Sequence, residues 1–437
     1  MSVDPQISQA IIPVVIIGGG AAGLAAAIEA GQYFAGQTTL AHDSGSYPVV
    51  LLESQNRVGR KILATGNGRC NLSHVPLTDS DYHSTEQIVP NQILRRFDGP
   101  KTLDWFRSLG LFCRIDDDGR VFPYSYQAAA VLDILRLKIE QLPVSVLTEK
   151  PVTHVKREQQ GFRIFTADGT TIRAHTAILA TGGLAAPAFG CDGSGYLLAQ
   201  ALGHPIIQPF PALVQICTQK EDVKGLEGIR IEGTATLEWQ NRPLRCETGE
   251  ILFTNYGLSG PPILQLSRGV QQVLNSDKPN GLTIRIDFLP GLDEQAIIGW
   301  LTERRNQNPE RPLEHLWTGL LHKKIGQMLT KKILGISLAS QAGSISDDHL
   351  DRLARAVKNE CLTVTGTRGW REAQVTAGGL SAAFFNPETL ESTLIPGLYA
   401  AGEVLDVDGD CGGYNLQWAW SSGRCAGYEA ALAVCSK

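Results

Sequence analysis

The start of the chain changes from strand-like to helix-like periodicity within a few residues. Ile11–Ile17 is a short apolar run rich in β-branched residues, which predicts a strand buried on both faces. Gly18–Gly20 predicts a turn, and the small residues of Ala21–Ala30, closed by Gly31, predict a helix. A second apolar run, Val49–Leu52, predicts another strand. Together they form a βαβ unit with a right-handed crossover, so the predicted fold class is α/β.

The turn in this unit carries a Gly-x-Gly-x-x-Gly pattern at Gly18, Gly20 and Gly23. The first glycine permits the tight turn, the second lets a pyrophosphate approach the backbone, and the third lets helix and strand pack closely. Free N–H groups at the helix N-terminus would then face the phosphates. Glu53 ends the second strand, where a carboxylate can accept hydrogen bonds from an adenosine ribose. A glycine-rich turn alone is only a turn, but the whole combination favours dinucleotide binding.

Glu53 lies further from the glycines than the usual spacing of about 20 residues. The connection from Gly31 to Pro48 is long and holds polar and glycine residues, so we expect an inserted surface loop there. Glycine is also abundant overall, with 46 residues in 437. The usual share is roughly 7%. Without repeats, such a surplus favours tight turns and close backbone approaches to a ligand.

Composition excludes several classes of protein. The net charge of -5 argues against a dedicated nucleic-acid binder, so nucleic acid is an unlikely partner. Nine cysteines include no Cys-x-x-Cys pair, which argues against a disulfide scaffold and a ribbon-type zinc site and fits a reducing compartment. His42, His74 and His204 lack the spacing of metal ligands, so no metal site is predicted.

The residues from Pro5 to Ile28 carry no charge, a stretch long enough to imitate a membrane span. Gly18–Gly20 and Pro13 interrupt it, and no Lys or Arg precedes Arg57. The basic flank of a signal peptide or an anchor is therefore missing. We expect a buried strand and helix here, no membrane association, and a cytoplasmic protein.

Two further segments have a composition suited to a cofactor. The first positive charges of the protein cluster in a glycine-rich loop, at Arg57, Arg60, Lys61 and Arg69, where guanidinium groups can bind phosphate oxygens. A solvated basic loop is as good an interpretation for any one of them. Near the other end, an apolar strand reaches Gly402-Glu403, and an acidic and glycine-rich loop leads into the last helix. Its backbone N–H groups could stabilise charge on a flavin, and the alternative is a helix cap with acidic loop residues. Only the combination with the N-terminal glycine motif makes a flavin preferable to nicotinamide as the bound dinucleotide.

The rest of the chain suggests a discontinuous domain. Residues 1–203 form its first part, with a small β-meander at about 144–177, and residues 367–437 form its second part. Residues 204–366 form an inserted β and helical domain on the substrate side. We also expect helices at Asn91–Leu109 and Ala128–Leu142 and a closing helix at Leu416–Val434.

Several motifs carry a resemblance to a known family. They are VVIIGGGAAGLAAA, GRKILATGNGRCN, ILATGG, LFTNYGLSGPPIL, TAGGL and GLYAAGEVLDVDGDCGGYNLQ. With these motifs in this order, the chain resembles the BaiN-like (YhiN-type) NAD(P)/FAD-dependent oxidoreductases over nearly its whole length. The resemblance implies a Rossmann-like FAD domain formed by both ends of the chain, with an inserted β-barrel-like and helical domain.

The resemblance also implies a set of FAD-binding residues. Those for the ADP half, the pyrophosphate and the flavin come from the first three motifs and from the end of the second strand at Glu53 and Ser54. Those for the ribityl–phosphate region and the isoalloxazine come from the last motif. They are Gly18, Gly20, Ala21, Ala22, Gly23, Glu53, Ser54, Arg60, Lys61, Gly66, Asn67, Gly68, Arg69, Cys70, Asn71, Ala180, Thr181, Gly182, Gly402, Glu403, Asp406, Gly413, Asn415, Leu416 and Gln417.

The sequence departs from the family at two points. Asn67 stands in a loop that is often all glycine, which could shift the backbone facing the flavin. Thr393 stands where relatives tend to have lysine. Tyr256 is the candidate proton donor, although a ring packed at a domain junction is an equal alternative. Cys70 lacks a resolving partner, so its thiol is interpreted as a small buried group and not as a redox centre.

The predicted function is that of an FAD-dependent oxidoreductase that reduces a small organic acceptor with hydride from NAD(P)H through the flavin. Only one strand–Gly-x-Gly-x-x-Gly–helix unit is evident, since Gly193-x-Gly195 lacks the third glycine. NAD(P)H therefore enters as a transient reductant implied by the resemblance. Two alternatives stay open. One is a fumarate-reductase or aspartate-oxidase type of flavoenzyme that uses another donor or oxygen, and the other is a non-catalytic flavin-binding redox sensor.

Overall fold

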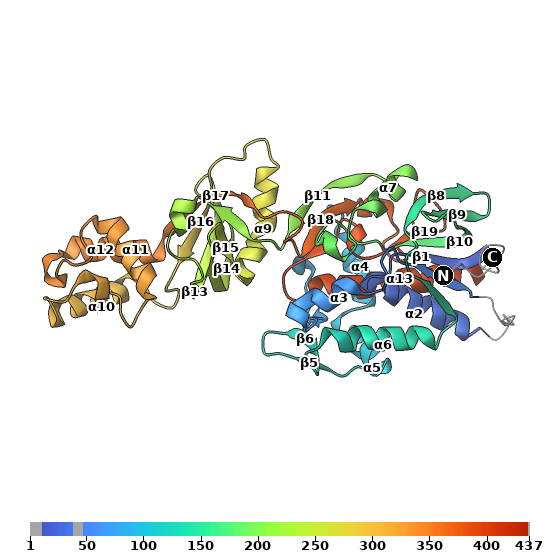
Figure 1. The fold of residues 1–437 in the computed structure, drawn as a ribbon, viewed down its shortest axis with the longest axis horizontal. Helices are drawn as coiled ribbons and strands as arrows, with labels where there is room; N and C mark the ends of the chain where they lie inside the picture. The colour runs from blue at the N-terminus through green and yellow to red at the C-terminus, as the bar shows by residue number, and fades with distance from the viewer. Residues whose placement is uncertain (1–10, 38–46, 436–437) are drawn as a thin grey trace. The chain divides into compact units, whose positions relative to one another are not determined.

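The computed structural model of the protein describes residues 11–37 and 47–435. Its contacts divide the chain into two compact units. One unit joins the two ends of the chain, Met1–Pro211 and Gln374–Lys437, and the other consists of Ala212–Ala373. The first contains a largely parallel sheet with helices and the second a closed antiparallel barrel with helices, so the predicted fold class is confirmed. The ribbon in Figure 1 shows both units.

The main sheet of the first unit has seven strands, and its centre is β1 (Ile11–Ile17). β1 pairs in parallel with β2 (Val49–Leu52) on one side and with β10 (Thr171–Leu179) on the other. β7 (Val144–Leu147) extends the sheet in parallel beyond β2, and β19 (Leu398–Ala400) pairs in parallel with β10. β8 (Val152–Glu158) and β9 (Gly161–Thr166) join β10 in an antiparallel meander. The predicted meander therefore loses its first strand to the parallel sheet.

The first helix, α2 (Ala21–Ala35), packs against the last, α13 (Tyr414–Cys435), and the blue and red ribbons in Figure 1 lie close together. Gly423 and Gly427 allow this approach, because a Cβ on either would lie 2.3 Å from a backbone oxygen of α2. The predicted helix end at Gly31 was wrong. A Cβ there would lie 2.7 Å from Val144 Cγ2, so Gly31 serves close packing of the helix interior and not a C-cap.

Shorter elements complete this unit. The predicted helix at Asn91–Leu109 is two helices, because the chain breaks at Phe97 and Asp98, and the Asp98 side chain caps the second by accepting a hydrogen bond from Lys101 N at 2.9 Å. The helices are α3 (Arg60–Ala64), α4 (Ile88–Arg96), α5 (Gly99–Ser108), α6 (Ala128–Glu140) and α7 (Ser194–Ala201). The small sheets are β3 (Ser73–His74) with β6 (Arg120–Pro123) and β5 (Cys113–Ile115), β4 (Tyr82–His83) with β20 (Asp408–Gly409), and β11 (Ile206–Ala212) with β18 (Val375–Leu380).

The second unit has a barrel whose apolar core includes Phe253, Ile284 and Leu237. The strands, in barrel order, are β12 (Ile216–Thr218), β15 (Gly257–Ser259), β14 (Arg242–Phe253), β13 (Arg230–Trp239), β16 (Leu282–Asp287) and β17 (Glu360–Thr367). The helices are α8 (Lys220–Val223), α9 (Pro261–Leu274), α10 (Glu294–Gln307), α11 (Lys323–Leu334) and α12 (Asp347–Lys358). The last three gather into one orange group in Figure 1, and Asp293 and Ser346 cap α10 and α12.

No helix among the described residues combines the length and the apolar character needed to cross a membrane. The uncharged stretch at the start of the chain is, within its described part, strand β1 and the beginning of α2. The core side chains of both elements are almost completely buried inside the first unit.

Candidate cofactor site

The three glycines of the turn between β1 and α2 have different surroundings. Gly18 has a φ of 108°, a left-handed value that favours glycine, and its N–H donates to Leu52 O at 2.8 Å. A Cβ on Gly23 would lie 1.8 Å from Gly18 O, so the third glycine is required for packing of the helix on the turn. A Cβ on Gly20 would meet no described atom within 4 Å. The turn is thus closed by protein at Gly18 and Gly23 and open at Gly20.

Glu53 lies at the end of β2 and is tied to this turn. Its Oε2 accepts a hydrogen bond from Gly19 N at 2.8 Å, and its Oε1 accepts one from Gln55 N at 2.7 Å. An open, polar cavity of about 620 Å³ adjoins this strand end. Its lining residues are Ser54, Gln55, Asn56, Arg57, Arg60, Glu149 and Pro151. The carboxylate, the turn and the cavity therefore lie together at the carboxyl end of the parallel strands, where ligands of such sheets bind.

Lys61, on α3, forms an ion pair with Glu403 at 2.7 Å, although 342 residues separate them. The other Glu403 oxygen, Oε1, accepts a hydrogen bond from Thr376 N at 2.9 Å. Burial works to lower the pKa of Lys61, but the charge and hydrogen bond of Glu403 together with the nearby Cys191 outweigh it, and the pKa is raised. Lys61 therefore keeps its positive charge. The ion pair also shows that the basic loop and the Gly402-Glu403 segment belong to one site.

The loop after α3 has an unusual backbone. Gly66, Asn67 and Gly68 have φ values of 57°, 54° and 83°, all in the left-handed region. Asparagine is one of the few other residues that enter this region readily. Asn67 therefore keeps the backbone conformation that glycine would adopt. Cys70 is also left-handed, at 58°, and its side chain is buried. Burial raises the pKa of its thiol to about 12, which keeps the sulfur protonated and unreactive.

Asn71 brings this loop together with the one before α13. A Cβ on Gly66 would lie 3.0 Å from Asn71 N, and a Cβ on Gly413 would lie 2.6 Å from Asn71 Oδ1 and 2.4 Å from Ser73 O. Asn71 Oδ1 is buried, and no described atom donates a hydrogen bond to it. An unpartnered buried acceptor costs free energy unless a ligand or water supplies a donor. It therefore marks the meeting point of the two loops as a place for a polar ligand.

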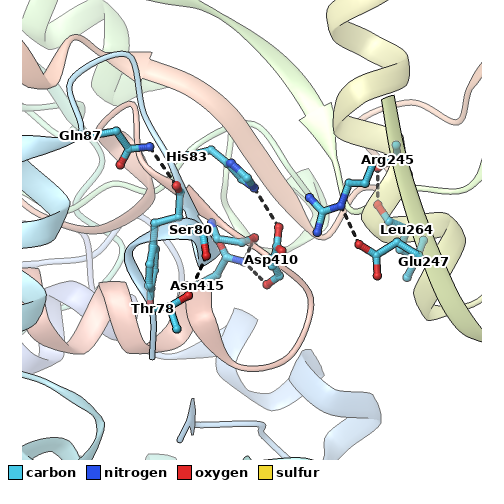
Figure 2. Close-up of polar contacts among 12 residues, drawn as sticks. Thr78, Ser80, His83, Gln87, Arg245, Glu247, Leu264, Asp410 and Asn415 are labelled. Carbon is cyan, nitrogen blue, oxygen red and sulfur yellow. Dashed lines mark hydrogen bonds and ion pairs between the residues drawn. The ribbon is translucent and has the colours of Figure 1, made fainter. Parts of the chain in front are cut away.

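The side chains of the acidic loop stabilise the loop itself. Asp406 is 2% exposed and accepts hydrogen bonds from the N–H and the hydroxyl of Thr85. Asn415 accepts from Gly409 N at 2.8 Å and donates to Gly409 O at 2.7 Å. Figure 2 shows His83 directed toward Asp410, and the His83 Nε2–Asp410 Oδ1 distance is 2.8 Å. These contacts fix the backbone conformation of the loop. Because the side chains are used within the protein, the backbone is the part of the loop that can contact a cofactor.

Gln417 is fully buried within α13, and its amide is used by the protein. Its Nε2 lies within hydrogen-bond distance of Phe97 O, Thr102 Oγ1 and Ser421 Oγ, which is enough to use both of its N–H groups, and its Oε1 accepts from Ser73 Oγ at 2.5 Å. Leu416 lies beside it at the start of the same helix. The Gln417 side chain therefore anchors the last helix to the Phe97–Thr102 segment, which is a structural task.

The remaining predicted residues also belong to the first unit. Ala180 N donates to Ile17 O at 2.8 Å, and its carbonyl oxygen would lie 2.4 Å from a Cβ on Gly18, so this segment lies against the glycine turn. Thr181 Oγ1 is 1.9 Å from the Cβ position of Gly195, which explains a glycine at the start of α7. Gly182 is left-handed, and Gly402 N donates to Ser422 Oγ at 2.9 Å.

The candidate catalytic residue Tyr256 belongs to the second unit. Its ring lies under the Arg368 guanidinium, with 4.9 Å from Cζ to the ring centroid, and its carbonyl oxygen accepts from Thr218 N at 3.0 Å. The predicted cofactor residues all belong to the first unit, so the structure places Tyr256 and these residues in different units.

Sequence reasoning missed two residues of this site. Thr376, in the TAGGL motif, accepts hydrogen bonds from Leu184 N and Ala185 N through its Oγ1, besides donating its N–H to Glu403. Tyr196 has a buried hydroxyl without a hydrogen-bond partner among the described residues, and burial raises its pKa. The TAGGL motif was a signal for Thr376, whereas nothing in the local sequence marks Tyr196.

The residues present fit a dinucleotide such as FAD. Gly20 leaves space open at a helix N-terminus, Lys61 keeps a positive charge nearby on α3, and Asn71 offers a buried acceptor between two loops. The sequence model of the HI0933-like protein Rossmann domain matches residues 12–429. The chain belongs to the HI0933-like family.

Two relatives of this HI0933-like protein span nearly its whole length. A 3-dehydro-bile acid delta(4,6)-reductase of Clostridium scindens is 38% identical, over 95% of this chain and 98% of its own. A ribosomal RNA dihydrouridine synthase of Escherichia coli is 32% identical, over 93% and 95%. Among solved structures, a 3-ketosteroid-delta4-(5alpha)-dehydrogenase from Rhodococcus jostii is 16% identical over 97% of both chains, with a TM-score of 0.48. The predicted membership of a family of FAD-binding Rossmann oxidoreductases is confirmed.

Proposed function

We propose that this HI0933-like protein is an FAD-dependent reductase that takes hydride from NAD(P)H and delivers it to a small organic acceptor. The observation that carries the proposal is the open face at Gly20, beside the helix N-terminus and the Glu53 carboxylate. A backbone free of side chains at a helix N-terminus is suited to a pyrophosphate. Glu53 stands where it can accept hydrogen bonds from a ribose.

The other residues of the site would complete the binding of FAD. Bound FAD supplies a ring that takes up a hydride and passes it on. Lys61, held by Glu403, would place a positive charge beside the phosphates, and Arg60 and Arg69 would add to it. The left-handed backbone of Gly66–Gly68 and the loop at Gly412-Gly413 would present N–H groups to the ring, while Asn71 Oδ1 would accept a hydrogen bond from it.

The acceptor we propose has a carbon–carbon double bond conjugated with a carbonyl group. The two relatives are named for a reductase of delta(4,6) double bonds in a 3-dehydro acid and for the conversion of uridine to dihydrouridine. Both names describe addition of hydrogen across such a bond. A general acid is required beside the hydride donor, since the carbon that does not receive hydride must receive a proton. Tyr256 is our candidate for that proton donor.

A second candidate function is reduction of a uridine in ribosomal RNA. The helical segment at residues 294–358 favours it, with ten Lys or Arg against seven Asp or Glu, although the whole chain has a net charge of -5. Lys323, Lys324, Lys331 and Lys332 are exposed along α11. A local excess of positive charge is what a phosphate backbone requires.

The test is an anaerobic titration of the purified flavoprotein with NADH and NADPH, followed by addition of a steroid 4-en-3-one or of unmodified ribosomal RNA. We expect one of the nucleotides to bleach the flavin and the steroid to restore its colour. Recovery with RNA alone would favour the second candidate. Bleaching by neither nucleotide would contradict NAD(P)H as the donor and would favour a fumarate-reductase type of flavoenzyme or a redox sensor.

A further inference from the structure

The hairpin of β5 and β6 exposes two aromatic rings of the first unit. Phe112 is 72% exposed and Tyr124 is 68% exposed. They lie opposite each other at the open end of the hairpin, since Tyr124 N donates to Phe112 O at 2.8 Å. Tyrosine and phenylalanine rings left in water form an apolar, flat surface that monomeric proteins often use to bind a partner or ligand.

Two arginines lie beside these rings. The Arg114 guanidinium is 5.8 Å from the centroid of Tyr124 and 4.8 Å from that of Tyr126, and the Arg69 guanidinium is 5.6 Å from that of Phe122. The Asp116 Oδ1 atom lies 3.5 Å from Arg114 Nε, so this carboxylate neutralises part of the arginine's charge. Arg69 has no ion pair with any residue that the structure describes. Beside the exposed rings, two guanidinium groups therefore stand against the one carboxylate of Asp116.

The aromatic hairpin, which is β5 and β6 with their exposed rings, is hydrogen-bonded directly to the loops that we propose bind the flavin. Leu72 N donates to Val121 O at 2.7 Å, and Ser73 pairs with Val121 in the β3–β6 ladder. A Cβ on Gly66 would lie 3.7 Å from the Phe122 ring. Arg69 belongs to the same Gly66–Asn71 loop that adjoins Gly413. The exposed rings and the proposed flavin loops therefore share one continuous, hydrogen-bonded framework.

We propose that the aromatic hairpin, formed by Phe112, Arg114, Tyr124 and Tyr126 with Arg69, is the docking site of the nicotinamide dinucleotide. A base of the nucleotide stacks on Tyr124 and Phe112, and the guanidinium groups of Arg69 and Arg114 bind its phosphates. The inference rests on the proposed function, in which NAD(P)H is the hydride source. Such a reductant needs a separate site, because the described residues include one strand–Gly-x-Gly-x-x-Gly–helix unit, and that unit is assigned to FAD.

The charges of the hairpin favour a small anionic ligand over a long nucleic acid. Asp116, Asp117 and Asp118 stand at its turn, and Asp118 is paired with Arg120. A pyrophosphate is short, and Arg114 already partly neutralises the carboxylate beside it, Asp116. An extended phosphate backbone that crossed the hairpin would meet them, and like charges without a partner repel.

The test compares Tyr124→Ala and Arg114→Gln with Tyr47→Ala, which removes a ring that is 39% exposed elsewhere in this unit. Binding of oxidised NAD⁺ and NADP⁺ is measured by calorimetry, and reduction of the flavin by NADH and NADPH is followed in anaerobic stopped-flow. We expect Tyr124→Ala to weaken binding of the preferred nucleotide about tenfold, the scale of one lost base–ring stack. Flavin content and reduction by dithionite are expected to equal those of the wild type and of Tyr47→Ala.

The outcomes separate the site from the proposed function. Unchanged nucleotide affinity in Tyr124→Ala and Arg114→Gln would overturn the site, as would a wild-type protein that binds neither nucleotide. A Tyr124→Ala variant that loses affinity for a single-stranded RNA oligonucleotide, with nucleotide affinity unchanged, would also overturn it. Tyr124-dependent nucleotide binding without reduction of the wild-type flavin would contradict the proposed function and support the site.

Discussion

Replacement of Gly20 by valine tests the placement of the cofactor phosphates with little disturbance of the protein itself. A Cβ at this position meets no described atom within 4 Å, and the φ of -78° suits any residue. Gly20 is the N-cap of α2, and loss of a good N-cap residue costs about 1 kcal/mol at most here. The melting temperature of the apoprotein should therefore fall by only about 2 to 4 °C.

The effect on FAD binding should be much larger. The valine methyl groups would occupy the space in which the pyrophosphate approaches the N–H groups of α2. A hydrogen bond to a charged group contributes about 1.5 to 3 kcal/mol. Loss of two of them would weaken binding by about 3 to 6 kcal/mol, or roughly 10² to 10⁴-fold in Kd. We expect Gly20→Val to be purified as a folded protein almost without flavin.

The assay is the ratio of visible flavin absorbance to protein absorbance, with a thermal melt of each apoprotein. Gly299→Val is the matched control, because a Cβ there also meets nothing within 4 Å and the residue lies in α10 of the other unit. Gly23→Ala is the contrasting variant, in which the new Cβ would lie 1.8 Å from Gly18 O and should destabilise the fold itself. Full flavin content in Gly20→Val would refute the placement of the phosphates.

Three further predictions follow from the geometry. Glu403→Gln leaves Lys61 without its charged partner, so it should lower the free energy of unfolding by about 2 kcal/mol and weaken FAD binding. Urea denaturation and the rate of flavin release measure the two effects, and unchanged values would contradict the role of the ion pair. Gln417→Leu should lower the free energy of unfolding by about 3 kcal/mol, because several buried partners lose their hydrogen bonds, and a neutral effect in urea denaturation would count against its structural role. The pKa of the Cys70 thiol is raised from 9.0 to about 12, so the unfolded chain releases this proton first and the stability of the fold should decrease as pH rises above 9. In alkylation of the native protein at pH 8, mass spectrometry should find exposed Cys246 labelled and Cys70 unlabelled. Fast labelling of Cys70 would show that its thiol is accessible.

Local patterns were sufficient to predict the first βαβ unit. The close packing at Gly18 and Gly23 and the open space at Gly20 follow from the backbone of one turn and its own helix, and the structure shows both; the pyrophosphate at Gly20 stays a prediction. Gly31 shows the limit of the same reasoning. A glycine can end a helix or allow close packing, and here the deciding contact is with Val144, more than a hundred residues away.

The side chains of the candidate site depend on similarly distant partners. The motif around Gln417 indicated its neighbourhood, but its amide is directed at Phe97 and Thr102, which no local pattern connects with it. Lys61 and Glu403 were both predicted at the site, whereas their ion pair requires the two ends of the chain to meet. Tyr124 and Phe112 carry no motif, and only their exposure in the structure reveals them.

The most direct test of the central claim is the visible absorption spectrum of the purified protein, with chromatographic identification of the cofactor released on denaturation. We expect a flavin spectrum and FAD at close to one molecule per chain, because the Gly18–Gly23 turn and Glu53 are assigned to its ADP half. A colourless protein that takes up no added FAD would contradict this assignment, and so would a protein that releases FMN, which has no ADP half to occupy the turn.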